Sequence, residues 1–131
     1  MDEAAAAHLG INRTDLRCLG VLLEQGPLPA SKLAEAVALT RGAMTTALDR
    51  IEQAGFIRRI RNDQDRRGVT IEATQTAKDA IKSIWAPIRA DGLAVLRKYS
   101  DADLELLCRF FEDYCEIQRT HAARIRGSEE A

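Results

Sequence analysis

The chain has 131 residues, of which 46% are hydrophobic and 30% are charged, and its formal net charge is −1 at pH 7. These values are typical of a soluble globular protein, and the length suffices for one domain with a modest core. No apolar run approaches the roughly 20 residues of a membrane-spanning helix, and the start is acidic, with Asp2 and Glu3 where a signal peptide would be basic. We therefore expect a cytoplasmic protein without a membrane partner.

The three cysteines are odd in number and form no C-x-x-C pair. Cys18, Cys108 and Cys115 therefore argue against a disulfide framework and against a zinc site. Only His8 and His121 accompany them, so no metal-ligand cluster is visible, and we expect no metal and no other cofactor. The cysteines are interpreted as small buried hydrophobic residues, with a thiol switch as the alternative.

Two helices are predicted first along the chain. Asn12, followed three residues later by Asp15, is a capping pair, and the apolar pattern behind it ends at Gly26. Residues 29–31 open a short second helix, with Ser31 in its first turn.

A third helix is predicted over residues 41–54, with Thr40 as its N-cap and Gly55 as its stop. Its two faces differ: the inward face comprises Met44, Ala47, Leu48 and Ile51, and the outward face comprises Gly42, Thr45, Thr46, Asp49 and Gln53, with Arg41 and Arg50 on the flanks. Small residues at the helix start allow a phosphate to approach free N–H groups. The threonines suit phosphates or base edges, and Arg41 suits a bidentate contact to guanine. The alternative is a face that is simply solvated.

A β-hairpin is predicted from residues 56–61 and 69–73, because the second segment alternates apolar and polar residues. Between Arg41 and Arg67, seven arginines outnumber four carboxylates, which leaves an excess of three positive charges. Adjacent guanidinium groups at a turn tip suit a narrow minor groove, and the neighbouring carboxylates would orient them. The alternative is a solvated charged loop. The tip contains Asp63, Asp65, Arg66 and Arg67.

Two long helices are predicted to complete the chain. Thr74 caps a helix that reaches about residue 99 and is expected to kink at Pro87. Ser100 and Asp103 form a capping pair for the final helix. Its apolar set is wide enough to contact both its own core and a second subunit. That set includes Leu104, Leu107, Cys108, Phe110, Phe111, Tyr114, Cys115 and Ile117.

Together these segments resemble the winged helix-turn-helix of the MarR (multiple antibiotic resistance regulator) family. The resemblance is carried by Gly26-Pro27, residues 33–35, 39–43, 48–52, 55–59 and 74–77, and most specifically by the Asp63-Gln64-Asp65-Arg66-Arg67 wing. It implies a mainly α fold with a small β-hairpin wing and long C-terminal dimerisation helices. It also implies an obligate homodimer, a palindromic operator, and repression that is relieved by a small ligand or by thiol oxidation.

The resemblance divides the single domain, residues 1–131, into two lobes. The DNA-binding lobe covers residues 13–74, and the helical dimerisation lobe covers residues 1–12 and 75–126. Family members commonly begin with a longer helix than Met1 to Leu9, so a weaker dimer is an open alternative.

Contacts to double-stranded DNA are expected from Ser31, Thr40, Arg41, Gly42, Thr45, Thr46, Arg50, Arg66 and Arg67, with Asp63 and Asp65 orienting the wing. A candidate effector pocket is expected from Arg17, Trp85, Arg89 and Tyr99; the alternative for Trp85 is a plain core residue. No nucleophile–base pair, phosphate loop or suitably spaced carboxylate pair is present in the sequence, so an enzyme is not expected. Two other functions stay open: a winged-helix protein-interaction module and a thiol-based redox-sensing regulator.

Overall fold

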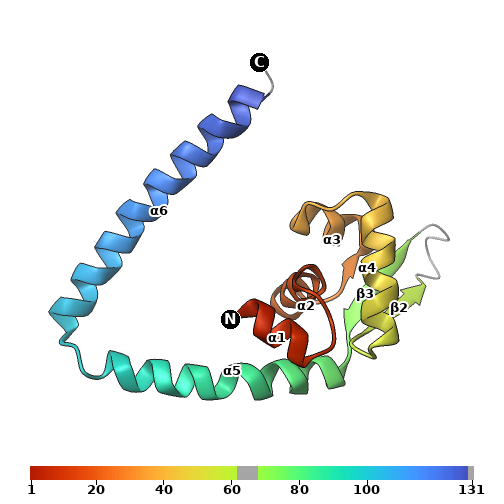
Figure 1. The fold of residues 1–131 in the computed structure, drawn as a ribbon, viewed down its shortest axis with the longest axis horizontal. Coiled ribbons are helices and arrows are strands. Elements are labelled where there is room, and N and C mark those ends of the chain that lie inside the picture. The colour runs from red at the N-terminus through yellow and green to blue at the C-terminus, as the bar shows by residue number, and fades with distance from the viewer. Residues whose placement is uncertain (62–67, 130–131) are drawn as a thin grey trace. The chain divides into compact units, whose positions relative to one another are not determined.

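A computed structural model describes residues 1–61 and 68–129 (Figure 1). Its elements are α1 (Asp2–His8), α2 (Arg13–Gln25), β1 (Leu28–Pro29), α3 (Ala30–Val37), α4 (Arg41–Gln53), β2 (Ile57–Arg61), β3 (Val69–Ala73), α5 (Gln75–Leu96) and α6 (Asp101–Glu129). The fold is therefore mainly helical with a small antiparallel sheet, as predicted.

The chain divides into two compact units, Met1–Ala86 and Pro87–Ala131. Helix α5 begins in the first unit and ends in the second, and it runs through Pro87. Because this division does not test function, the predicted DNA-binding and dimerisation lobes stay a prediction, as does the kink at Pro87.

The sheet contains one strand that the sequence pattern did not predict. Its order is β1-β3-β2, and β1 pairs with β3 through Leu28 opposite Ile71 and Pro29 opposite Thr70. Two residues are too few to show the alternation that identifies a strand. Pro29 lacks an N–H, which an edge strand tolerates. The predicted hairpin is confirmed in the paired strands β2 and β3, up to Arg61 opposite Val69.

The main core of the first unit lies between the sheet and helices α2, α3 and α4. Figure 1 shows α4 beside β2 and β3. The apolar face of each helix packs inward because burial removes its apolar area from water. The buried residues are Cys18, Leu19, Leu22, Leu33, Val37, Met44, Leu48, Ile51, Phe56, Ile57, Ile71, Ala73 and Ala77.

A second, smaller cluster joins α1 to α2 and to the first part of α5. Ala5, Ala6 and Leu16 are buried there, and half-buried Ile81, Ile84 and Trp85 pack against them. The small alanine side chains allow α1 to approach α2 closely. The apolar residues of α5 thus pack inward as far as Trp85, while Ile88, in the second unit, is exposed.

In the second unit, α6 begins at the predicted capping pair. The Asp103 N–H donates to Ser100 Oγ at 3.2 Å, and the Ser100 N–H donates to Asp103 Oδ2 at 3.0 Å. The Ser100 hydroxyl and N–H lower the pKa of Asp103 because both donate to its ionised form. Apart from half-buried Leu104, the wide apolar set is exposed in the single chain, and Phe110 stacks on Tyr114 with ring centroids 6.1 Å apart. The exposed set includes Leu106, Leu107, Phe110, Phe111, Tyr114 and Ile117.

Candidate nucleic-acid interface

Helices α3 and α4 are joined by a three-residue turn. Ala38 closes α3 in the left-handed region at φ 55°, and the Leu39 N–H donates to the Ala34 carbonyl at 2.9 Å. Thr40 then caps α4, since its Oγ1 accepts from the Ala43 N–H at 3.2 Å. The predicted cap is confirmed, and the hydrogen bond orders the start of α4, where anions are favoured.

The two faces of α4 are as the sequence predicted. Met44, Ala47, Leu48 and Ile51 are buried. On the other side, Arg41, Gly42, Thr45 and Thr46 are exposed. The first half of α4 therefore presents small and polar side chains to solvent while its opposite face is fixed in the core.

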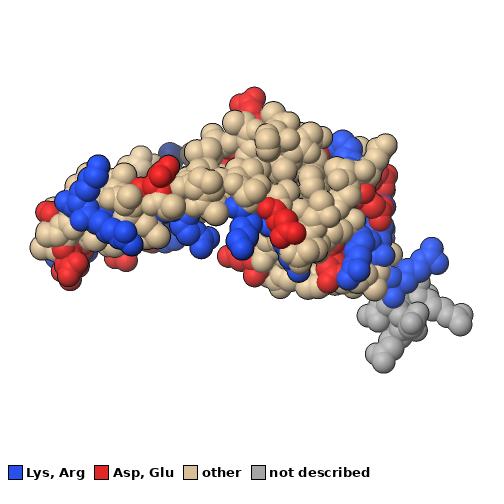
Figure 2. Space-filling view, turned by 90° about the horizontal axis from the view of Figure 1, so that it is seen from below, with Lys and Arg blue, Asp and Glu red and all other residues tan. Residues whose placement is uncertain are grey.

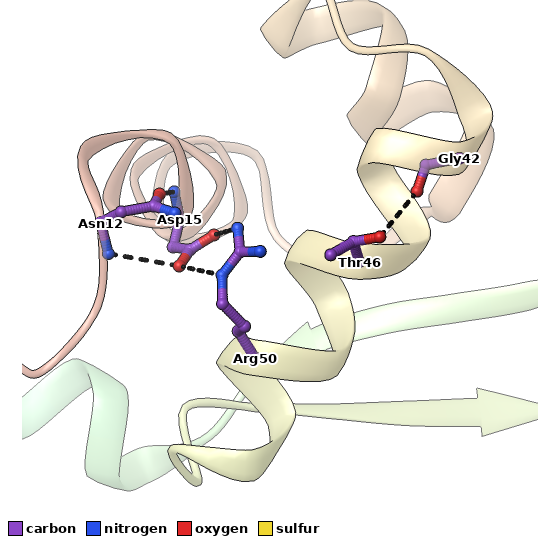
Figure 3. A network of polar contacts seen from close by, with 5 residues as sticks. All are labelled: Asn12, Asp15, Gly42, Thr46 and Arg50. Atoms are coloured by element: carbon purple, nitrogen blue, oxygen red, sulfur yellow. Dashed lines mark hydrogen bonds and ion pairs between the residues drawn. The ribbon is translucent and has the colours of Figure 1, made fainter.

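Both outward threonines bond back to their own helix. Thr45 Oγ1 donates to the Arg41 carbonyl at 3.0 Å, and Thr46 Oγ1 donates to the Gly42 carbonyl at 3.2 Å (Figure 3). Because the hydroxyl protons are used within the helix, the lone pairs and methyl groups remain for an incoming ligand. In a DNA groove these groups suit an adenine or cytosine amino group and a thymine methyl.

Arg50, which the sequence placed on the flank of this face, is held by α2. Its Nη2 donates to Asp15 Oδ1 at 2.7 Å and its Nε donates to Asp15 Oδ2 at 3.1 Å (Figure 3). The Asp15 side chain is 0% exposed, whereas that of Arg50 is 44% exposed. The same carboxylate accepts from the Asn12 N–H at 3.2 Å. The hydrogen bond to Asp15 raises the pKa of Arg50.

Two arginines of β2 are also paired within the chain. Arg59 bridges two carboxylates of α4, with Nη2 2.6 Å from Asp49 Oδ1 and Nη1 bonded to Glu52. Arg58 lies 2.6 Å from Glu72 of β3. Asp15 and Glu72, which lie outside the stretch from Arg41 to Arg67, therefore neutralise two of the three excess positive charges counted there. Figure 2 accordingly shows Lys and Arg interspersed with Asp and Glu over the surface in view.

Arg41 and Arg61 remain outside these pairs. Across residues 1–61 and 68–129, neither forms an ion pair, and both are exposed. Arg41 also lines a cleft of about 530 Å³ between α3 and α4, together with Ser31 and Thr45. The structure thus brings together three predicted DNA-contacting residues from two helices.

The predicted wing tip lies outside the described residues. This applies to Asp63, Asp65, Arg66 and Arg67. Their predicted roles stay predictions, while the strands that lead into and out of the tip are described.

A second cleft, of about 280 Å³, lies between α1, α2 and α5 within the first unit. It contains two of the four residues predicted for an effector pocket, Arg17 and Trp85, together with Arg13, which was not predicted to lie there. Arg13 and Arg17 lie four residues apart on α2, which is the spacing of side chains on one helix face. The other two predicted residues, Arg89 and Tyr99, belong to the second unit.

The cysteines do not share one environment. Cys18 is 0% exposed, and its burial, reinforced by the charge of Asp15, raises its pKa from 9.0 to about 11. Cys108 and Cys115 are exposed in the single chain, so their interpretation as buried residues is wrong there. Within the described ranges, no group of three or more His, Cys, Asp and Glu could hold a metal ion. In the same ranges, no helix is both long and apolar enough to cross a membrane.

The helix-turn-helix, the hairpin beside it and the exposed first half of α4 define a winged helix-turn-helix protein. The MarR family profile matches residues 11–69. The HTH-type transcriptional regulator YcgE of Bacillus subtilis (strain 168) is 32% identical over 95% of this chain and 80% of its own length. The chain belongs to the MarR family and is a DNA-binding transcriptional regulator, not an enzyme.

Further comparisons agree with this fold. The HTH-type transcriptional regulator PecS of Dickeya dadantii (strain 3937) is 26% identical over 74% of this chain, which spans 49% of PecS. A MarR family protein from Bacillus stearothermophilus has a TM-score of 0.72 at 21% identity, covering 90% of this chain and 82% of its own. The S. aureus MepR–DNA complex has a TM-score of 0.64 at 20% identity, with coverages of 72% and 78%.

Proposed function

We propose that this regulator binds a palindromic operator as a homodimer and acts as a ligand-responsive repressor. The observation that carries the proposal is the exposed first half of α4, which is small and polar outside and anchored by buried residues inside. An α-helix with such a face fits the major groove, where each base pair presents its own pattern of donors and acceptors. The cytoplasmic location expected from the sequence is part of this proposal.

The DNA contacts divide between phosphates and bases. The capped start of α4, at Thr40 and Gly42, faces a DNA phosphate, and Ser31 of α3 contacts the sugar–phosphate backbone of the DNA. Arg41, exposed and without an ion pair within residues 1–61 and 68–129, reads a guanine, while Thr45 and Thr46 offer acceptors and methyl groups to the base edges.

The hairpin extends the contact to the neighbouring minor groove. Arg66 and Arg67 supply the guanidinium groups there, and Asp63 and Asp65 orient them. The strand pairing of β2 and β3, which ends at Arg61 opposite Val69, supports this role because it brings both ends of the tip together.

The second copy of the chain packs against α6. Its exposed apolar residues form a stripe that includes Phe110 and Phe111, each 58% exposed. Soluble proteins rarely leave such a stripe open to water. A two-fold dimer presents two copies of α4, which a palindromic operator matches.

The cleft beside α1 is the proposed effector site. Arg13 and Arg17 line this cleft together with the carboxylate of Asp2 and the apolar side chains of Leu16, Ile81 and Trp85. This arrangement suits a small anion with an apolar body, whose charge would pair with the arginines.

Two other functions, protein interaction and redox sensing, fit these observations less well. A protein-interaction module would not need an exposed arginine at the start of a small-residue helix face. Redox sensing would rely on the exposed Cys108 and Cys115. These lie seven residues apart on α6, about 10 Å along the helix axis, so a disulfide between them within one chain is excluded.

The test is DNA binding by the ligand-free protein across a salt series, using random duplexes and duplexes selected by the protein from a random library. Phosphate contacts predict a steep loss of affinity as salt rises, and base contacts predict enrichment of a two-fold symmetric sequence. Absent or salt-insensitive binding would contradict the proposal and favour protein interaction.

A further inference from the structure

A two-point ion pair joins α2 to α4. Asp15 is 0% exposed and accepts from two atoms of Arg50, at 2.7 Å and 3.1 Å, as well as from the backbone of Asn12. A fork of this kind fixes the direction of the guanidinium as well as its distance. The apolar contacts of Met44, Leu48 and Ile51 hold α4 against the core, but such contacts have little directional preference.

Because the pair lies at one end of α4, a small change of helix angle there displaces the exposed half at the other end. Arg50 lies in the last turn of the helix and Arg41 in its first. Nine residues of helix span about 13 Å, so a tilt of about 10° around Arg50 moves the side chains of the first turn by about 2 Å. Hydrogen bonds to base edges tolerate only a few tenths of an ångström. A small change of helix angle would therefore disturb base contacts more than phosphate contacts.

We propose that Asp15 and Arg50 are a positioning pair for DNA recognition. In this pair the buried carboxylate fixes the orientation of α4, and it keeps the Arg50 guanidinium from serving mainly as a phosphate contact. The inference rests on the proposed function and deepens it. It removes Arg50 from the expected DNA-contacting set and adds Asp15, which the sequence pattern predicts only as part of a helix cap.

The two roles of Arg50 predict opposite behaviour of a lysine variant. Lysine keeps the charge and serves as a point contact to phosphate, but it cannot reproduce the bidentate fork. Under the positioning role, Arg50→Lys loses discrimination between sequences. Under a phosphate role, Arg50→Lys keeps its affinity, and Asp15→Asn, which frees the arginine, leaves binding unchanged or stronger.

The experiment compares the full-length wild type with Arg50→Lys, Arg50→Gln, Asp15→Asn and the double variant Asp15→Asn/Arg50→Gln. The probes are a duplex that the wild type selects from a random library and a shuffled duplex of equal length and composition. Affinity for each duplex is measured across a salt series, and circular dichroism establishes that each protein is folded at the assay temperature. Ile71→Val, which removes a buried methylene from β3 and leaves both members of the pair in place, is the control for lost stability alone.

We expect each single variant to lower the ratio of the affinity for the selected duplex to that for the shuffled duplex about tenfold. This is the discrimination that one good base contact provides. The double variant should lose no more than the worse single variant, because the two residues act as one unit. Affinity for the shuffled duplex and the salt slope should stay near the wild-type values, and Ile71→Val should keep the wild-type ratio.

Several results would overturn the inference while leaving the proposed function intact. One is a salt slope that falls by about one phosphate contact in Arg50→Gln but not in Arg50→Lys. Others are additive losses in the double variant or an equal loss in Ile71→Val. A wild type that selects no sequence would instead remove the proposed function, and this inference with it.

Discussion

Arg50 of α4 and Asp15 of α2, 35 residues apart in the chain, form a two-point pair in which the acid is buried and the base is half exposed. The pair joins Asp15, the third residue of the capped helix α2, to the last turn of α4, whose threonines face solvent. Figure 3 shows both helices meeting at this contact.

Removing Arg50 should lower the free energy of unfolding. Arg50→Ala leaves the Asp15 carboxylate buried without its counter-charge, and we expect a loss of about 2–3 kcal/mol. Urea denaturation followed by circular dichroism measures it. The matched control is Glu35→Gln, which breaks the exposed Lys32–Glu35 pair and should change stability by less than about 0.5 kcal/mol. Equal effects of the two variants would show that the buried pair adds nothing.

Arg41 should act on sequence preference. Arg41→Ala removes the proposed guanine contact and should cost about 1–3 kcal/mol in binding the preferred sequence, with relaxed selection at one base position per half-site. Selection from a random library by wild type and variant tests this. An equal loss of affinity for every sequence would instead identify Arg41 as a phosphate contact.

Two left-handed positions should respond in opposite directions to exchange of glycine and alanine. Ala38 has φ 55° and Gly55 has φ 80°. A Cβ is strained there by about 1–2 kcal/mol, partly offset by the greater freedom of glycine in the unfolded chain. Ala38→Gly should therefore stabilise the protein by about 0.5–1 kcal/mol, and Gly55→Ala should destabilise it by a similar amount. Thermal unfolding measures both, and a shift of the same sign in both variants would contradict the argument.

Cys18 should make stability depend on alkaline pH. Its pKa is raised from 9.0 to about 11 in the folded chain, so folding favours the protonated thiol. The contribution of this preference to the free energy of unfolding is fully present below pH 9 and is lost as the pH rises from 9 to about 11. The stability difference between wild type and Cys18→Ala should therefore narrow between pH 8 and pH 10.5, by urea denaturation at each pH. A constant difference would show that the thiol does not ionise differently on folding.

Phe110 should be required for dimerisation. Phe110→Glu places a charge within the exposed apolar stripe of α6, and burying it in an interface is costly. We expect a shift from dimer to monomer in sedimentation velocity. Ala123→Glu introduces the same charge on the opposite side of α6 and should leave the dimer intact. A Phe110→Glu variant that remains dimeric would show that the dimer interface lies on another surface.

The local features of the fold were predictable from the sequence. Asn12 and Thr40 cap their helices as expected, and the buried and exposed faces of α4 fall where the helical period puts them. These features depend on residues within one or two turns of each other, so the order of residues is sufficient to specify them. The strand of Leu28 and Pro29 escaped prediction because it exists only through its pairing with β3.

Two capping pairs show most clearly what could not be predicted from the sequence. In the sequence, Asn12 with Asp15 and Ser100 with Asp103 have the same spacing, and both were predicted as helix starts. By itself the sequence determined that helices begin there, since a cap bonds to backbone three residues away. The tertiary structure alone decided that Asp103 stays in water while Asp15 is buried against Arg50, because packing α2 on α4 removes water from one carboxylate and supplies a distant guanidinium to it.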